Sequence, residues 1–139
     1  MPEFSIPYDS ARGHFMTRAA ESFLRALGGG SVLLRLPVGA PAGSSDLGLA
    51  SPLIEDVALE PAVVRALPPG QDAGQARIEV LLSAAAVEAQ VERSGYPSAE
   101  ELFAAALGLV LAGKLWRVAS VTSDTFAGAA YLYRVTATP

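Results

Sequence analysis

The chain has 139 residues, of which 51% are hydrophobic and 17% are charged, and its net charge at pH 7 is −4. This length suits a single domain that can fold without a disulfide or a metal ion. The absence of cysteine excludes disulfides, thiol catalysis and Cys-ligated zinc. The ten basic residues are scattered, so a tight grip on nucleic acid is not expected. No apolar run approaches the roughly 18–20 residues of a membrane span, so we expect a soluble chain with no membrane partner.

Residues 1–8 contain two prolines and little pattern, and they are expected to form an extended N-terminal arm. A helix is predicted over residues 9–27, capped by Asp9 or Ser10 and ended by three glycines at 28–30. Its apolar side is predicted to hold Met16, Ala20, Phe23, Leu24 and Leu27. Its polar side is predicted to hold Arg18, Glu21 and Arg25 at the spacing of surface ion pairs.

Residues 31–82 are predicted to be rich in β-structure. Alternating apolar residues predict strands over 31–36 and 77–82, and residues 53–67 read as two strands or as one strand bent at Pro61. Two long loops separate these strands: residues 38–52, which are rich in Gly, Ser and Pro, and residues 68–76, which contain two prolines and two glycines. Loops of such length in a compact domain are usually functional or disordered.

A helical insertion is predicted over residues 84–107. Ser83 caps its first helix, which runs from Ala84 to about Arg93 and is broken at Gly95. The segment that begins at Ser98 is a capping box and opens a second short helix to about Leu107.

The C-terminal part, residues 109–137, is predicted to form hairpins. Ala112-Gly113 marks the first tight turn, and Ser123–Thr125 with Gly128 marks the second. The last strand runs from Ala129 to Thr136 and places Tyr131, Tyr133 and Val135 on one face.

The order of these elements predicts a mainly β, α+β domain over residues 9–139. Neighbouring antiparallel pairs, rather than βαβ alternation, favour a small antiparallel barrel or sandwich with an N-terminal helix and a short helical insertion.

We find no pattern that predicts catalysis, a cofactor site or a metal site, and we expect a chain that is not an enzyme. His14 is not near a recognisable nucleophile motif or a cluster of Asp or Glu residues at metal-ligand spacing. The glycines at 28–30 follow a predicted helix, whereas the glycines of a dinucleotide-binding loop follow a strand. Glu100 and Glu101 fit the first turn of a helix, where carboxylates are favoured. The carboxylates of Glu55, Asp56 and Glu60 are expected to be solvated.

Three aromatic residues near the C-terminus admit two interpretations. In the first interpretation, Trp116 packs in the core or lies half buried on the sheet, and Tyr131 and Tyr133 pack against side chains of neighbouring strands. The alternative is a ligand-binding or inter-subunit face formed by the same side chains.

The order of elements resembles a family of prophage-encoded proteins from the head–tail joining region. The resemblance lies in the front helix, in "GGGSVLLRLP" and "LIEDVALEPAVVR", and in the closing "LVLAGKLWRVASVTSDTFAGAAYLYRVTA". This last segment is similar to the final hairpins of bacteriophage head-closure (stopper) and related connector proteins, with matches at Gly113, Lys114, Trp116, Val118 and the strand Tyr131 to Thr136. The chain departs from stoppers in its helical insertion and its long first helix, so adaptor, stopper and tail-side stations all stay open.

The resemblance implies a structural virion protein that forms a homo-oligomeric ring. Its expected partners are a portal or adaptor protein on one side and a tail-side neck protein on the other, with packaged double-stranded DNA passing through without specific binding. The two loops are long enough to reach such neighbours, and the interaction residues expected in them are Pro41, Gly43, Ser44, Asp46, Pro69, Gln71 and Asp72. The alternative function is a small β-barrel module that binds a ligand or a peptide.

Overall fold

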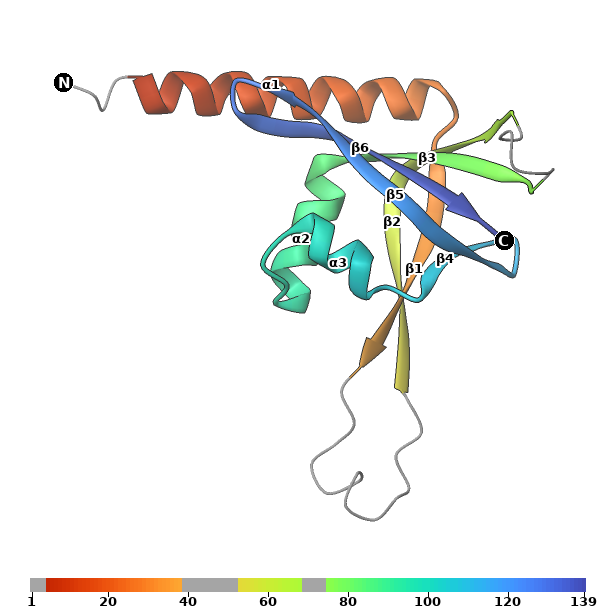
Figure 1. Cartoon of the computed structure of the whole chain (residues 1–139). Coiled ribbons are helices and arrows are strands. Elements are labelled where there is room, and N and C mark those ends of the chain that lie inside the picture. Colours follow the sequence, from red (N-terminus) through yellow and green to blue (C-terminus); the bar gives the residue numbers. More distant parts are fainter. Residues whose placement is uncertain (1–4, 39–52, 69–74) are drawn as a thin grey trace, which may run out of the picture.

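The computed structural model describes residues 5–38, 53–68 and 75–139. These residues form six strands and three helices (Figure 1). In chain order the elements are α1 (Ser5–Ala26), β1 (Gly30–Val38), β2 (Leu53–Leu67), β3 (Arg77–Ser83), α2 (Ala84–Ser94), α3 (Ala99–Ala105), β4 (Gly108–Leu111), β5 (Lys114–Phe126) and β6 (Ala129–Thr138).

The six strands form a closed barrel in the order β1-β2-β3-β6-β5-β4, and every neighbouring pair is antiparallel. Alternation along the strands explains the core, because every second side chain of a strand points to the same face. In β1 this gives buried Val32, Leu34 and Leu36, which meet buried side chains from β2, β3 and β6 in one cluster. The predicted small antiparallel barrel with an N-terminal helix is confirmed.

β2 is one strand that pairs with two neighbours in succession. Its first part pairs with β1 and its last part, from Ala62 onward, pairs with β3. The pairing with β1 is irregular between Gly30 and Val32, opposite the segment that holds the buried Pro61. Proline has no N–H to give to a ladder, so it is tolerated at such an irregular point.

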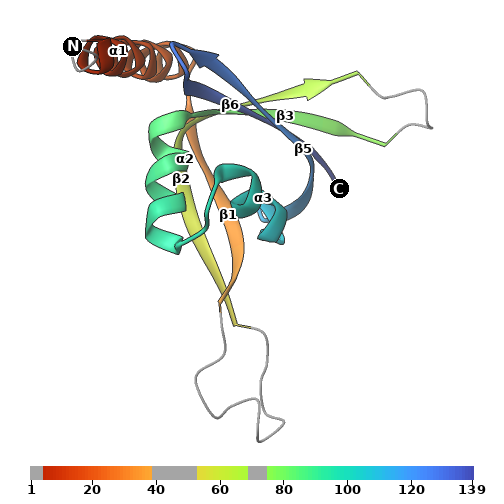
Figure 2. The same cartoon turned by 60° about the vertical axis from the view of Figure 1, so that its left-hand side comes forward.

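The helical insertion joins the barrel core, and its caps are those predicted. The hydroxyl of Ser83 accepts a hydrogen bond from the N–H of Ala86, and Gly95 ends α2 in the left-handed conformation at φ 77°. The hydroxyl of Ser98 accepts from the N–H of Glu101 at the start of α3. α3 ends at Ala105, two residues earlier than expected, because the Leu107 N–H donates to the carbonyl of Arg35 in β1. Figure 2 shows both helices packed beside the barrel strands.

Two predicted boundaries were wrong. α1 begins at Ser5, so residues 5–8 are helical and do not belong to an extended arm. Pro7 is compatible with this start, because it lies in the first turn, where backbone N–H groups have no acceptor within the helix. The last turn lies at Ala127-Gly128, and the segment Ser123–Thr125 stays in β5, paired with β6.

α1 rests on the barrel along one side, and its N-terminal half extends past the strands (Figure 1). Leu24 is fully buried, as predicted, but Phe23 and Leu27 are 61% and 52% exposed. Glu21, predicted to face solvent, accepts a hydrogen bond from the Ser83 hydroxyl at 3.2 Å. The side of α1 that meets the barrel is therefore rotated toward Glu21, which leaves Phe23 and Leu27 outside.

Candidate functional site

The residues with candidate chemistry lie where ordinary structural roles explain them. Within the described part of the chain, no group of three His, Asp or Glu side chains is arranged to hold a metal ion. Glu100 and Glu101 lie in the first turn of α3, as expected. The glycines after α1 end that helix, with the Gly29 N–H donating to the carbonyl of Leu24 at 2.8 Å.

The C-terminal aromatic residues serve mainly as packing. Tyr133 belongs to the buried core, and this burial, with the nearby Glu88 and Glu100 carboxylates, raises the pKa of its hydroxyl. Trp116 packs against the same core, and the ammonium of Lys114 lies 4.7 Å from the centre of its ring. Tyr131 lines a cavity of about 310 Å³ between α1 and β6. Trp116 and Tyr133 therefore pack at the core, whereas Tyr131 lines a cavity at the surface.

The predicted interaction residues Pro41, Gly43, Ser44, Asp46, Pro69, Gln71 and Asp72 all lie outside the described residues. The structure does describe the strand ends that lead into the first loop. There, the ends of β1 and β2 pair with each other and extend away from the barrel as a two-stranded ribbon, residues 37–38 and 53–54 (Figure 1). Its exposed apolar side chains are Val38, Leu53 and Ile54, which are 39%, 44% and 50% exposed.

The base of this ribbon is fixed by an ion pair. The guanidinium of Arg35 donates to both carboxylate oxygens of Asp56, at 2.8 and 3.0 Å. The two residues are directly opposite each other in the β1–β2 register. Hydrogen bonding by Arg35 holds the pKa of the Asp56 carboxyl below its ordinary value. The pair gives the ribbon a defined direction where it leaves the barrel.

A second set of charges crosses four neighbouring strands. Glu79 of β3 contacts Arg65 of β2 and Arg134 of β6, and Arg134 also donates to Asp124 of β5 at 2.9 Å. Positive and negative side chains therefore alternate across β2, β3, β6 and β5. These basic groups are held by carboxylates, which makes them poor candidates for binding phosphate.

The exposed side of α1, here called the α1 face, combines aromatic and basic side chains, and its Ala19 and Phe23 also line the cavity between α1 and β6. Phe15 is 63% exposed, and Phe23 is 61% exposed. Arg18 and Arg25 are also exposed on this helix. Sequence reasoning missed Phe15 and placed Phe23 inside, although the four-residue spacing of Phe15, Ala19 and Phe23 predicts a continuous apolar stripe.

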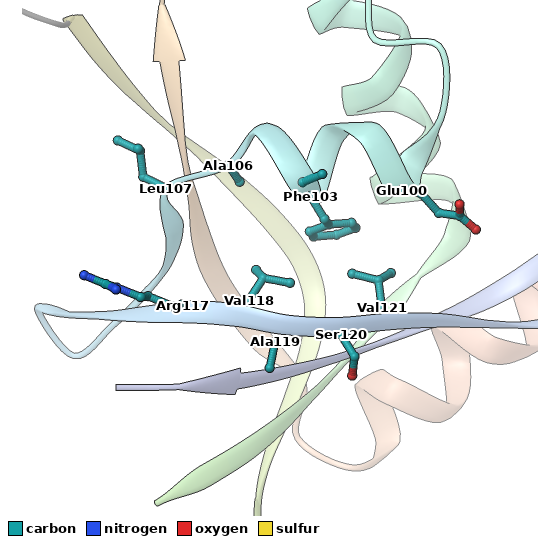
Figure 3. Close-up of a pocket in the computed structure, with 10 residues that line it drawn as sticks. Glu100, Phe103, Ala106, Leu107, Arg117, Val118, Ala119, Ser120 and Val121 are labelled. Atoms are coloured by element: carbon teal, nitrogen blue, oxygen red, sulfur yellow. The ribbon is translucent and has the colours of Figure 1, made fainter. Parts of the chain in front are cut away.

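A groove of about 520 Å³ lies between α3 and β5, here called the α3–β5 groove (Figure 3). It exists because β4 has four residues and pairs with β5 only as far as Trp116. Among the described residues, β5 beyond that point pairs with β6 alone, and its ladder is irregular between Val118 and Ser120. The groove is lined by Glu100, Phe103, Ala104, Ala106, Leu107, Arg117, Val118, Ala119, Ser120 and Val121.

The charged side chains that line this groove are Glu100 and Arg117, and the two helices of the insertion carry mostly negative charge. α2 and α3 together contain Glu88, Glu92, Glu100 and Glu101 against a single basic residue, Arg93. All five side chains are exposed. Desolvation of the Glu88 carboxyl raises its pKa above the ordinary value.

Comparison with protein-family models, with curated proteins and with solved structures gave no match for this chain. Among the described helices, none is long and apolar enough to cross a membrane. The class of protein that the fold and surfaces define is a small antiparallel β-barrel with an N-terminal helix and several unlike exposed surfaces.

Proposed function

We propose that this chain is a structural virion protein of a bacteriophage neck. In this proposal, identical copies form a ring between the portal or adaptor protein and the tail, and the ring helps to retain packaged DNA. The sequence resemblance to head–tail connector proteins names this class. The geometry supports it through one observation: a single chain leaves unlike apolar surfaces exposed on α1, on the β1–β2 ribbon and in the α3–β5 groove.

Unlike surfaces are what a ring of identical subunits requires. A head-to-tail contact joins one patch of a subunit to a different patch of the next, and it closes into a ring when the rotation allows. Additional surfaces are then needed for the proteins above and below the ring. The ribbon, with its exposed Val38, Leu53 and Ile54, suits such an axial contact, because it extends away from the barrel (Figure 1).

The charges agree with a ring through which DNA slides. The chain is acidic, and three of its arginines, Arg35, Arg65 and Arg134, pair with carboxylates. A surface of net negative charge repels the phosphate backbone. We therefore propose passage of double-stranded DNA without specific binding.

Removing the coding sequence from an inducible prophage tests this proposal. We expect electron microscopy of the lysate to show heads and tails that are not joined, with a reduced fraction of heads that still contain DNA. Expression of the chain from a plasmid should restore joined particles. Normal, infectious particles without the chain would contradict the proposal.

The second candidate is a module that binds a small molecule or a peptide. The α3–β5 groove favours it, because its volume lies within the usual range of about 300–1,000 Å³ for ligand sites. Saturable binding of a compound or peptide by the isolated chain, lost when Val118 is changed to Asp, would support this function. Such binding together with particles that assemble normally without the chain would replace the first proposal.

A further inference from the structure

The α1 face carries two aromatic side chains that the chain itself leaves mostly exposed. Phe15 and Phe23 are each more than three-fifths exposed, although the burial of a Phe side chain is favourable. They lie at four-residue steps from Ala19, which is also exposed. Large and small side chains thus alternate along the stripe, as on helix surfaces that fit into a groove.

The charge beside this stripe is positive in a chain that is negative overall. Arg18 and Arg25 are exposed on α1. The carboxylate between them in sequence, Glu21, is directed to the barrel, where it accepts from Ser83. A partner for this surface should therefore be a partly apolar groove with carboxylates at its rim.

The α3–β5 groove has that chemistry. Phe103, Leu107 and Val118 supply apolar walls, and Glu100 lines the groove with Glu101 next to it on α3. Arg117 lines the opposite end of the groove from Glu100 (Figure 3), so the end at Glu100 and Glu101 is the one that suits the arginines of α1.

One copy of the chain cannot join its own two surfaces. In Figure 3, α3 lies on one side of β5, and α1 lies on the other. Figure 1 shows the same order, with β5 and β6 between the two helices. Each copy thus presents both halves of a complementary contact, pointing in different directions.

We propose that the α1 face of one copy docks into the α3–β5 groove of a second copy. Phe15 and Phe23 enter the groove, and Arg18 and Arg25 lie beside Glu100 and Glu101. The inference rests on the proposed ring and names the contact between its subunits. Because the two patches differ, the contact repeats from copy to copy and leads to a ring or a filament.

Two variants, each defective in one half of the contact, test this inference. Phe23→Asp places a charge on the α1 face, and Ala104→Arg fills the groove and repels Arg18 and Arg25. Both positions are exposed, so the fold should be unchanged, which circular dichroism and thermal melting check. Ile54→Asp on the ribbon is the matched control, because Ile54 is half exposed and belongs to neither surface.

Sedimentation velocity of the purified chains, from micromolar to millimolar concentration, gives the readout. We expect the original chain and Ile54→Asp to form species larger than a dimer as concentration rises, and each of the two defective variants to stay monomeric. An equimolar mixture of Phe23→Asp and Ala104→Arg should form a dimer and grow no further, because one intact α1 face meets one intact groove.

Two results would overturn the inference. One is an original chain that stays monomeric throughout. The other is a mixture that stays monomeric although the original chain associates, since that indicates a symmetric contact such as α1 on α1. If the contact fails while particles still contain the chain, the neck proposal survives with another subunit contact. If the contact holds while particles lack the chain, the neck proposal fails and the self-association stands.

Discussion

The hydroxyl of Ser83 donates to Glu21 Oε1 at 3.2 Å, across 62 residues of sequence, while it accepts the N–H of Ala86 at 3.3 Å. Ser83 is fully buried at the junction of β3 and α2. One side chain therefore fixes α1 to the barrel and begins the helical insertion.

Changing Ser83 to Ala should lower the free energy of unfolding by about 1–3 kcal/mol, because the helix cap is lost and the Glu21 carboxylate loses a donor. Urea unfolding measures this effect. Ser98→Ala, which removes the matching cap of α3 alone, should cost about 1 kcal/mol. Equal stability of Ser83→Ala and the original chain would show that the junction does not depend on this hydroxyl.

Two phenylalanines of opposite exposure form a matched pair. Phe103→Ala should cost about 3–5 kcal/mol, because Phe103 is 1% exposed and joins α3 to the barrel core. Phe23→Ala should change the stability of the monomer by no more than about 0.5 kcal/mol. Unfolding curves of the two variants and the original chain, measured at a concentration where the chain is monomeric, give these differences in the free energy of unfolding. A large loss for Phe23→Ala would mean that α1 buries this ring in the monomer.

Gly108 permits the close approach of β4 to β5. Its φ is +152°, and a Cβ at this position would meet the carbonyl oxygen of Trp116. Gly108→Ala should therefore cost several kcal/mol or prevent folding, since both backbone strain and a clash with main-chain atoms arise. Gly128→Ala is the control, because its φ is +79° and nothing lies near the added Cβ. It should cost about 1 kcal/mol. Thermal melting measures both effects. A similar loss of stability in Gly108→Ala and Gly128→Ala would contradict the claim that Gly108 is needed for the close approach of β4 to β5.

The Arg35–Asp56 pair should make stability depend on pH. The folded-state pKa of Asp56 is lowered, so the stabilisation is present above the ordinary pKa of an aspartate and is lost as pH falls through the lower folded value. Unfolding measured from pH 7 to pH 2 should show that Asp56→Asn is less stable than the original chain at neutral pH, and that the difference shrinks in acid. Because the pair is exposed, the effect should be small. A difference that stays constant over this range would show that the ion pair contributes nothing.

Much of the fold follows from local sequence signals. Ser83, Gly95 and Ser98 act as predicted because caps and left-handed glycines depend on near neighbours. The alternation in β1 predicts its buried face for the same reason.

Features that depend on distant contacts were not predicted. The rotation of α1 is set by Ser83, which lies 62 residues from Glu21. The extension of β5 through Ser123–Thr125 is set by pairing with β6 and by the Asp124–Arg134 ion pair. The α3–β5 groove results from the shortness of β4, which no pattern within β5 reveals.

The most direct test of the central claim is quantitative mass spectrometry of phage-like particles purified from the induced source culture. We predict that this chain is present beside a portal protein at a few to some tens of copies per particle, as expected for one ring. Particles that form, contain the portal protein and lack this chain would contradict the claim.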